Sequence, residues 1–533
     1  MKQTLQFFLL SATFFCCTNV ALSQVPGTLD SSFANNGVKI LKPSTGFDNA
    51  YSVEILEEGK MLIGGASEVS GPGNWDAVVY RLNDNGNIDN TFGNNGFAYY
   101  DYQGYSQYVR SMKRLSNGKL LFVGGAEANF QVDVFVTQLN EDGTPDASFG
   151  DNGTLMIPIS SGEDIALAVT EQPDGKLVVV GNCSFNGYTY LNSFALRLNT
   201  NGSLDLTYGN NGIAIIDAGY DYESAEDVLL MDDGGILAAG HVDNGSDDYA
   251  ILTFKLNSSG QLDNDYGNNG IAVYDLSNDD DMAYAILRSP ADNKILLGGK
   301  IGAPNYESDF LVMALTDAGI IDSSFGTNGI SILNLKPIDA GLDLTVQTNG
   351  KLVLGGTAGS GFAANDFALC RFNQDGTIDS TFGTNGSTLS EISTFFSEIE
   401  SIALQADGKI VAVGIAASSN NNMGVVRYKG DEVVATGSAA LNFKHDEIKL
   451  NIYPNPSNGN FCIALNDATH YSGQVNAQLF NLQGQKVYEG QLEMHDGLLK
   501  ESLNVSKFVT SDVYFLKIFI GANAYCSSMV IQD

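Results

Sequence analysis

Basic residues are scarce in this chain of 533 residues. Only 27 lysines and arginines stand against 62 aspartates and glutamates, which gives a formal net charge of −35. Such a polyanion gains nothing from counterion release on nucleic acid and is repelled by anionic lipid. We therefore expect no nucleic-acid partner, and we interpret the acidity as a means of keeping an extracellular protein soluble.

Residue types that build metal and nucleophilic sites are also few. The chain has four histidines, six cysteines and one tryptophan. His241 is the one histidine in the repeated region described below, at a position where other units carry glycine, asparagine or isoleucine, and this favours a surface residue over a catalytic base. Clusters of histidine and cysteine with metal-ligand spacing are missing from the sequence. We therefore expect neither a cofactor nor a metal site built from these residues.

Long apolar runs are missing as well. The early run from Leu5 to Phe15 is too short for a membrane span, which needs about 18 residues. It follows the basic Lys2 and precedes the small-x-small sequence Ala21-Leu22-Ser23. We predict a signal peptide over residues 1–23 and no membrane span. In the oxidising compartment that this implies, the tail cysteines allow a Cys462–Cys526 disulfide, on which the fold does not depend.

One unit of nearly 60 residues is repeated seven times. An aromatic residue followed by Gly-x-Asn-Gly recurs every 57–59 residues, at Phe33, Phe92, Phe149, Tyr208, Tyr266, Phe325 and Phe382, the first with Ala34 in place of the first glycine. A turn-Gly-Lys pattern keeps the same register at Gly59, Gly118, Gly175, Gly234, Asn293, Gly350 and Gly408. An Arg-Leu-Asn pattern does so at Arg81, Gln138, Arg197, Lys255, Ala314, Arg371 and Arg427. Three markers in register seven times indicate a repeat architecture.

The repeat predicts an all-β fold, a seven-bladed propeller of four-stranded blades. Short apolar runs bounded by Gly, Asn and Asp turns predict strands near residues 153–157, 166–171, 176–181 and 193–198 of one unit. Four strands per unit are typical of a propeller blade. An open solenoid is the alternative, but no unit has the polar character of a cap.

The two ends of the repeated region favour a closed ring. Residues 29–33 have the sequence that follows the fourth strand in every other unit, whereas the seventh unit ends at Tyr428 without it. The N-terminal segment would therefore complete the last blade. Units such as residues 366–383 resemble the bacterial delta-60 repeat family, and the resemblance covers residues 29–430. It implies a propeller of a secreted protein and no particular chemistry.

A different pattern begins after a polar segment, residues 431–448, which we interpret as a linker. Residues 449–533 contain apolar runs at 460–465, 475–479 and 513–519, and their length suits a small Ig-like β-sandwich. This segment resembles the C-terminal sorting domain of the type IX secretion system of Bacteroidota. The resemblance rests on these residues: Tyr453, Pro454, Asn455, Pro456, Gly459, Gly484 and Tyr514. It implies contact with the secretion machinery and a secreted or outer-surface location reached through the periplasm.

The most visible repeated motif, Asn-x-Asp-Gly-x-Leu-Asp, superficially suggests a calcium loop of alternating oxygens. Residues 257–263 and 199–205 keep the turn but have lost carboxylates that other units carry. A tight turn with Asx hydrogen bonds explains the pattern better, and calcium is the minor alternative. Paired glycines such as Gly64-Gly65 end strands and precede no helix, so close backbone packing explains them better than phosphate binding.

The irregular loops are the best place in the sequence for a binding site. In an up-and-down blade the repeated turns share one face, so the loops that vary share the other. Those loops are rich in aromatic residues and acids, from which we select as ligand-binding candidates Trp75, Tyr102, Tyr105, Tyr188, Tyr190, Tyr220, Asp221, Tyr222 and Tyr306. Aromatic rings beside carboxylates are typical of sugar-binding and protein-binding surfaces.

Three functions remain open at this stage. The leading hypothesis is a non-enzymatic binding or adhesion module, monomeric, that recognises a glycan or a protein through the irregular loops. The second is a carbohydrate-active enzyme, a hydrolase or lyase, that uses acids of the same face. The third is a purely structural surface protein. No catalytic residue can be named from the sequence.

Overall fold

The computed structural model describes residues 25–71, 73–128, 131–185, 190–243, 248–361 and 365–431, and, nearer the C-terminus, 450–453, 455, 457–466, 473–481, 486–495, 498–509, 512–520 and 523–531. The expected signal peptide, residues 1–23, and residues 432–448 of the expected linker lie outside this set. The chain divides into two compact units between residues 432 and 433. No described helix is long and apolar enough to cross a membrane.

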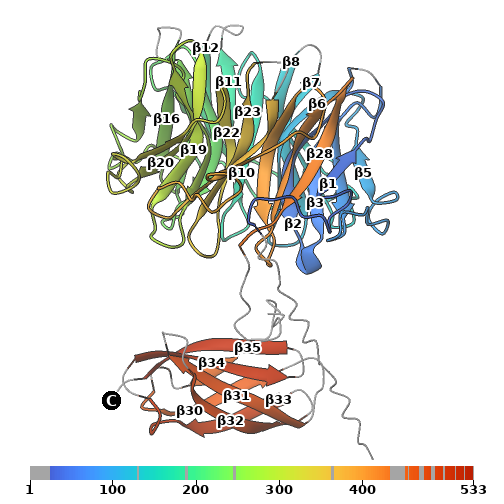
Figure 1. The fold of residues 1–533 in the computed structure, drawn as a ribbon. Helices are drawn as coiled ribbons and strands as arrows, with labels where there is room; N and C mark the ends of the chain where they lie inside the picture. Colours follow the sequence, from blue (N-terminus) through green and yellow to red (C-terminus); the bar gives the residue numbers. More distant parts are fainter. Residues whose placement is uncertain are drawn as a thin grey trace, which may run out of the picture. The chain divides into compact units, whose positions relative to one another are not determined.

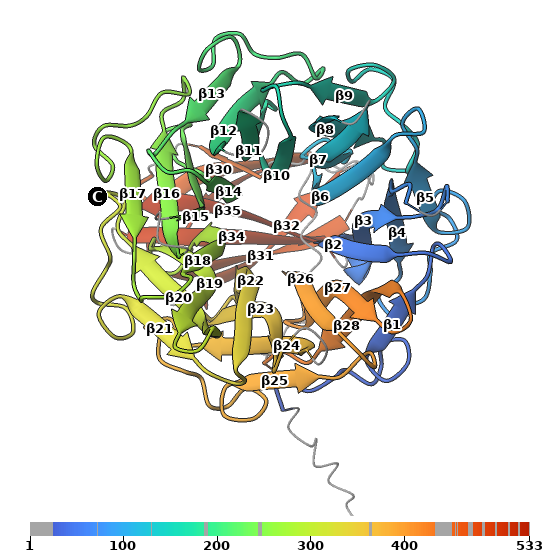
Figure 2. The same cartoon turned by 90° about the horizontal axis from the view of Figure 1, so that it is seen from above.

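The first unit is a ring of four-stranded antiparallel blades, seven of them within the described residues (Figures 1 and 2). Figure 2 shows the inner strands around a common axis. The inner strands are β2 (Asp48–Ile55), β6 (Ser106–Arg114), β10 (Asp164–Glu171), β14 (Glu223–Leu230), β18 (Met282–Arg288), β22 (Ile338–Val346) and β26 (Ser397–Leu404). The second strands are β3 (Met61–Ser67), β7 (Leu120–Ala128), β11 (Leu177–Phe185), β15 (Ile236–Asp243), β19 (Ile295–Ala303), β23 (Leu352–Gly359) and β27 (Ile410–Ala417).

The outer half of each blade is built in the same way. The third strands are β4 (Asp76–Leu82), β8 (Gln131–Leu139), β12 (Tyr190–Leu198), β16 (Tyr249–Leu256), β20 (Glu307–Leu315), β24 (Asn365–Phe372) and β28 (Asn421–Tyr428). The outermost strands are β5 (Phe97–Tyr100), β9 (Thr154–Ile157), β13 (Ile213–Ile216), β17 (Ile271–Tyr274), β21 (Ile330–Leu333), β25 (Ser387–Ser390) and β1 (Val38–Leu41). A blade is therefore offset from the sequence unit: the predicted strand near 153–157 is the outer edge of the preceding blade.

Closure of the ring follows the prediction from the two ends. Strand β1 pairs antiparallel with β28, with Val38 opposite Val426 and Leu41 opposite Met423. The last blade thus takes three strands from the end of the repeated region and one from its beginning. Buried side chains pack between neighbouring blades, as where Val136 of β8 and Val179 of β11 share one cluster. The core is therefore a set of interfaces between blades, each dependent on its neighbours.

The antiparallel order also fixes where the loops lie. In the blade β10–β13, the β10–β11 and β12–β13 turns are at one end, and the β11–β12 turn and the β13–β14 connection are at the other. The repeated turns share the first end and the irregular loops share the second, as the sequence predicts. We call the second end the irregular-loop face.

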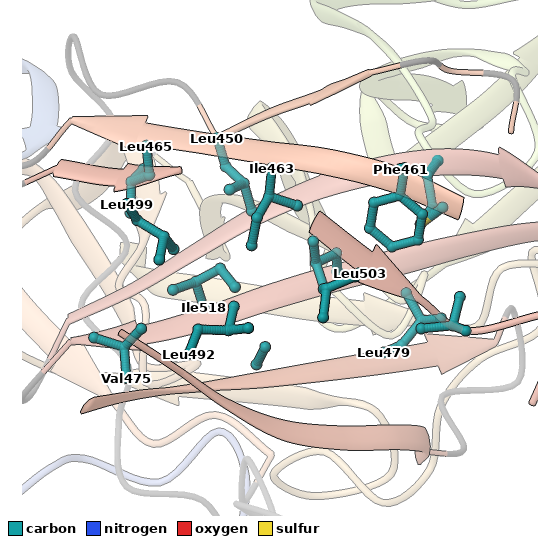
Figure 3. Close-up of a cluster of buried hydrophobic side chains, with 14 of the residues drawn as sticks. Leu450, Phe461, Ile463, Leu465, Val475, Leu479, Leu492, Leu499, Leu503 and Ile518 are labelled. Atoms are coloured by element: carbon teal, nitrogen blue, oxygen red, sulfur yellow. The ribbon is translucent and has the colours of Figure 1, made fainter. Parts of the chain in front are cut away.

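The second unit is a two-sheet β-sandwich. One sheet contains β29 (Asn451–Tyr453), β30 (Asn460–Asn466) and β33 (Leu498–Asn504). The other contains β32 (Lys486–Met494), β31 (Gly473–Asn481), β34 (Asp512–Ile520) and β35 (Asn523–Ile531). Phe461 and Ile463 from the first sheet pack with Leu479 and Ile518 from the second (Figure 3). Cys462 is a free thiol whose Sγ lies 3.2 Å from the hydroxyl of Ser502, not half of the disulfide that the sequence allows.

Candidate ligand-binding channel

Where a blade carries all three repeated sequence markers, they meet in one ionic cluster. In the blade β10–β13, Asp205 accepts hydrogen bonds from Lys176 Nζ at 2.9 Å and Arg197 Nε at 2.8 Å. The Arg197 guanidinium lies over the Tyr208 ring, 4.7 Å from its centroid. Hydrogen bonds from Thr207 and Lys176 hold the pKa of Asp205 well below its usual range. The lysine, arginine and aromatic markers are therefore scaffold, and Asp205 is saturated by protein donors.

The predicted Asx turns are also present. Asp142 Oδ1 accepts the backbone N–H of Thr144 at 2.9 Å, and Asp375 does the same for Thr377 at 3.0 Å. Each carboxylate also accepts the threonine hydroxyl. These oxygens are engaged within their own turns, which is the role that the tight-turn interpretation assigns to them. Among the described residues no three His, Cys, Asp or Glu side chains are grouped to hold a metal ion.

A glycine in each second strand shapes the inner strand beside it. A Cβ at Gly240 of β15 would overlap the carbonyl oxygen of Ser224 in β14. Ser224 lies two residues before Glu226, the extra residue of a β-bulge between Ala225 and Asp227. The same overlap and the same bulge recur in every described blade, opposite Gly65, Gly124, Gly181, Gly299, Gly356 and Gly414. Close backbone approach, as expected for these glycines, thus permits a bulge at one fixed point of each blade.

The bulged residue differs from blade to blade and lines the axial channel. The seven bulged residues are Tyr51, Arg110, Leu167, Glu226, Tyr284, Leu342 and Glu400. All seven line one cavity of about 640 Å³. The framework is therefore repeated, while the side chains it presents toward the axis are not. At the irregular-loop face the lining continues through Glu163, Leu191 and Tyr222, so the cavity reaches that end of the ring.

Carboxyl groups are the most numerous ionisable groups that line the channel. Burial raises the pKa of both Glu398 and Glu400 in β26, and repulsion from Glu398 raises that of Glu400 further. Burial also raises the pKa of Asp343 to about 7 and that of Asp227 to about 6. The one basic lining residue among them is Arg110, whose guanidinium lies 5.6 Å from the centroid of the Tyr51 ring.

Two of these acids connect neighbouring blades. Asp227 Oδ2 accepts the backbone N–H of Ile286 in the next blade at 2.8 Å. Asp343 Oδ2 accepts the N–H of Ile402 at 2.7 Å. Each follows a bulged residue, and the bulge leaves a backbone N–H of the next inner strand within its reach. Asp227 and Asp343 are thus structural links, which distinguishes them from the glutamates of the channel.

His241 is not the surface residue that its variable position suggested. Its side chain is 7% exposed in β15, and its ring stacks on Tyr222 with the centroids 5.8 Å apart. Tyr249 meets it edge-on at 5.3 Å and Tyr284 lies at 6.2 Å. Its Nδ1 has no hydrogen-bond partner and lies 3.7 Å from Glu226 Oε1. Burial lowers the pKa of His241. His241 therefore packs behind Tyr222 and Tyr284, which line the channel, and is not itself a lining residue.

The candidates chosen from the irregular loops do not form one site. Trp75 packs near Phe47 with ring centroids 6.5 Å apart, and Tyr102 packs against Tyr105 and a core phenylalanine. Tyr306 stands alone at the tip of the β19–β20 hairpin, 94% exposed. Tyr188 lies outside the described residues.

Four candidates gather between the blades β10–β13 and β14–β17. Tyr222 lines the channel, and the carbonyl of Asp221 accepts the N–H of Leu191, another lining residue, at 3.0 Å. Tyr190 precedes Leu191 and is 44% exposed. Tyr220 is half-buried against the core between these blades. The structure therefore joins Tyr190, Asp221 and Tyr222 to the mouth of the channel.

Several acids of the irregular-loop face are buried caps rather than exposed ligands. Glu223 Oε1 accepts the backbone N–H groups of Ala218 and Tyr220 at 2.7 and 3.3 Å. Asp164 and Asp281 receive equivalent backbone bonds from the loops before them. Glu223 and Asp164 are the first residues of β14 and β10, and Asp281 directly precedes β18, so each stands where a loop meets the inner strand of its blade. Their role is to fix the shape of the loops.

The motif residues of the C-terminal unit hold strand connections. Asn455 Oδ1 accepts the N–H of Val530 at 2.8 Å, and the Gly459 carbonyl accepts the N–H of Val505 at 2.8 Å. Gly459 has a φ of 91°, where a side chain would be strained. Tyr514 is buried in β34, whereas Tyr453 is 43% exposed. Pro454, Pro456 and Gly484 lie outside the described residues.

Family comparison identifies both units. Residues 451–532 match the secretion system C-terminal sorting domain. Residues 58–92, 115–149, 172–208, 347–382 and 405–431 match the domain of unknown function (DUF5122) β-propeller. The chain is a DUF5122 β-propeller with a type IX sorting domain. The sorting domain shows that the propeller is exported to the cell surface or the medium, and it implies interaction with the type IX secretion system.

Solved structures also match the chain, at low sequence identity. PorZ of Porphyromonas gingivalis, a surface component of the type IX secretion system, is 13% identical; the match covers 91% of this chain and 59% of that one, with a TM-score of 0.37. A family 25 ulvan lyase is 12% identical over 63% of this chain and 77% of that chain, with a TM-score of 0.36. An endo-arabinase of Bacteroides thetaiotaomicron is 11% identical over 53% and 99%, with a TM-score of 0.30. With TM-scores below 0.5, these likenesses carry no argument about function. No curated protein matches the sequence.

Reasoning from sequence missed the channel residues of the DUF5122 propeller. The signal that could have found them is their nearly constant distance from a repeated glycine along the sequence. Glu226 and Tyr284 stand 14 and 15 residues before Gly240 and Gly299, the glycines opposite their bulges. A position that keeps its place in the repeat but changes its residue is a site that the scaffold does not constrain. The sequence does not show that the strand before each of these glycines is the innermost strand of its blade. The position could therefore not be placed at the axis from the sequence.

Proposed function

We propose that this DUF5122 propeller is a non-enzymatic binding module of the cell surface or medium, whose glycan or protein ligand enters the axial channel from the irregular-loop face. The observation that carries the proposal is the ring of bulged residues, which presents seven side chains of four different types to one cavity of about 640 Å³. A purely structural ring needs no such variation at equivalent positions, whereas a ligand without sevenfold symmetry does.

The two ends of the channel support entry from one side. The lining residues Glu163, Leu191 and Tyr222 lie at the irregular-loop face. Tyr190 and Asp221 adjoin them there, so they extend the proposed surface beyond the channel itself. The opposite end carries the repeated turns. Because these turns are nearly alike in every blade, they present few distinctive side chains for a ligand to recognise. Half-buried tyrosines give broad contact area at small cost in side-chain entropy.

Binding by the mature full-length chain to glycan and peptide arrays tests the proposal. Tyr222→Ala combined with Tyr284→Ala removes two aromatic walls of the channel and is expected to abolish the interaction. Tyr306→Ala is the matched control, because Tyr306 is exposed and far along a hairpin from the cavity. The proposal fails if the double variant binds as tightly as the unaltered protein while its thermal unfolding is unchanged.

A specific observation favours a second function, that of a carbohydrate-active hydrolase or lyase. Glu398 and Glu400 lie two residues apart in β26, both line the channel, and the pKa of each is raised by burial. A carboxyl group kept protonated near neutral pH beside another is suited to general acid catalysis. Product release from a polysaccharide panel, abolished by Glu398→Gln or Glu400→Gln, would establish this function in place of simple binding.

A further inference from the structure

We propose that the ligand of the channel is a basic peptide segment, whose lysine or arginine side chain is held beside Glu226 between Tyr222 and Tyr284. This inference rests on the proposed function and names its ligand. It begins from the lining: the cavity has six carboxyl groups, those of Glu163, Glu226, Asp227, Asp343, Glu398 and Glu400, and one guanidinium, that of Arg110. Burial raises the pKa of Asp227, Asp343, Glu398 and Glu400, so the site is built on Glu226 rather than on these four.

The wall formed by β14 and β18 has the chemistry of an organic-cation site. Tyr222, Glu226 and Tyr284 all line the cavity from this side. A cation near the face of a tyrosine is attracted by the ring quadrupole, and an adjacent carboxylate adds a charge-assisted hydrogen bond. The Glu226 carboxylate is held in place, because Ser224 Oγ donates to its Oε1 at 2.6 Å and Asn182 Nδ2 donates to Ser224 Oγ at 3.1 Å.

His241 supports this wall from behind and is not itself a lining residue of the cavity. Its ring stacks on Tyr222 and lies 6.2 Å from the Tyr284 ring, and its side chain is more than nine-tenths buried. The two tyrosine rings are therefore held in place by packing. A ligand in the cavity meets these rings and Glu226 rather than the imidazole.

The size and remaining lining of the cavity favour a peptide over a small free amine. About 640 Å³ exceeds the space that one ammonium group occupies, and Ile165, Leu167 and Leu342 add apolar surface to the cavity. Long basic side chains pack their methylene stems on such surface while the charged end finds its partner. The net charge of −35 also attracts basic segments over long range.

Fluorescence anisotropy with the mature full-length chain tests the inference. The probes are labelled pentapeptides with central lysine or arginine, the same peptides with acetyl-lysine or citrulline, and spermidine as competitor. We expect binding of the charged peptides only, weakened at least tenfold by Glu226→Gln or Tyr284→Leu. The control variants Asp265→Asn and Tyr306→Ala should stay within twofold, because one removes an exposed acid of the repeated β16–β17 turn and the other an exposed ring that does not line the cavity.

The outcomes separate this inference from the proposed function. Equal affinity for charged and neutral peptides, or wild-type affinity in Glu226→Gln, would overturn the basic-peptide ligand. Binding of spermidine but of no peptide would overturn it as well. A neutral glycan whose binding is lost in Tyr222→Ala/Tyr284→Ala but kept in Glu226→Gln would leave the proposed function standing and remove the inference. If no probe or glycan binds in a manner that responds to channel variants, both fall.

Discussion

Arg427 Nε donates a hydrogen bond to Asp30 Oδ2 at 2.9 Å, although 397 residues separate them. In the blade β10–β13 the equivalent pair, Arg197 and Asp205, is only eight residues apart. The same ionic cluster thus stabilises a turn in one blade and joins the two ends of the ring in another. Ring closure is therefore stabilised by the same Arg–Asp pair that elsewhere joins residues of a single blade.

Loss of Asp30 should weaken the ring more than loss of another partner of the same arginine. Asp30→Ala leaves the buried Arg427 guanidinium without a buried carboxylate, and we expect it to cost about 3 kcal/mol. Asp84 also pairs with Arg427, at 2.8 Å, but its side chain is 52% exposed, so Asp84→Ala should cost about 1 kcal/mol or less. Urea unfolding at pH 7 measures both. Equal costs would contradict the special role of the buried pair.

Acid should selectively remove the contribution of Asp322. Hydrogen bonds from Lys294 and then Ser324 lower its pKa to about 2 from the ordinary 3.8. The stabilisation is therefore complete above pH 3.8 and is lost as the pH falls through about 2. After allowance for solvent screening, Asp322→Asn should cost about 1 kcal/mol at pH 7, and this cost should disappear below about pH 2. Asp317→Asn, which alters a 70% exposed partner of Arg288, serves as control. A cost for Asp322→Asn that does not change with pH would refute the ionic explanation.

A side chain added at Gly240, opposite the bulge of β14, should destabilise the blade β14–β17. In Gly240→Ala the new Cβ would overlap the Ser224 carbonyl oxygen, so the backbones of β14 and β15 must separate. We expect a loss of about 3 kcal/mol and, because Glu226 is re-aimed, weaker channel binding. At Gly104, where φ is 73° and no atom lies near, alanine should cost only about 1 kcal/mol. Thermal unfolding and the binding assay report the two effects, and a neutral Gly240→Ala would show that the bulge does not need glycine.

Mild alkali should weaken the propeller through Glu400. Its folded-state pKa is raised above the ordinary 4.5 by burial and by Glu398. The associated stability is therefore complete below pH 4.5 and is lost as the pH rises through the raised value. Glu400→Gln cannot ionise, so its Tm should exceed that of the unaltered protein by about 2 °C at pH 8 and match it at pH 4.5. The exposed Glu391→Gln should change neither. A lower Tm for Glu400→Gln at pH 8 would mean that the channel stabilises the charged form.

Removal of the sorting domain should stop export at the periplasm. Deletion of residues 449–533 leaves the N-terminal segment intact but removes the part that matches the sorting family. Fractionation of cells that carry a type IX system should then find the truncated chain in the periplasm and the full chain at the surface or in the medium. A carrier protein fused to residues 449–533 is the converse control. Surface delivery of the truncated chain would show that another segment directs export.

Much of the fold is predictable because the repeat is a local property. Phe33, Arg81 and the turn at Gly59 recur in register, and each turn and strand follows from a few neighbouring residues. The N-terminal copy around Asp30 even predicts closure with Arg427. The candidate site was less accessible: of the aromatic residues in the irregular loops, Tyr222 lies in the channel wall, while Trp75 and Tyr102 pack against the blades.

The sequence by itself determined the seven units, the separate β-sandwich and the export route, because each rests on motifs within a few residues of one another. It also determined the closed ring, because the segment that the last unit lacks stands before the first unit. Only the tertiary structure decided that β2, β6 and their equivalents are innermost, that His241 is buried, and that Glu226, Tyr284 and Glu400 share one cavity. The reason is physical. The bulge forms because a glycine of the second strand lets a carbonyl group of the inner strand approach closely. The bulged residue faces the axis because all blades close around that axis. Such placement depends on contacts between residues more than a hundred positions apart, which no local pattern records.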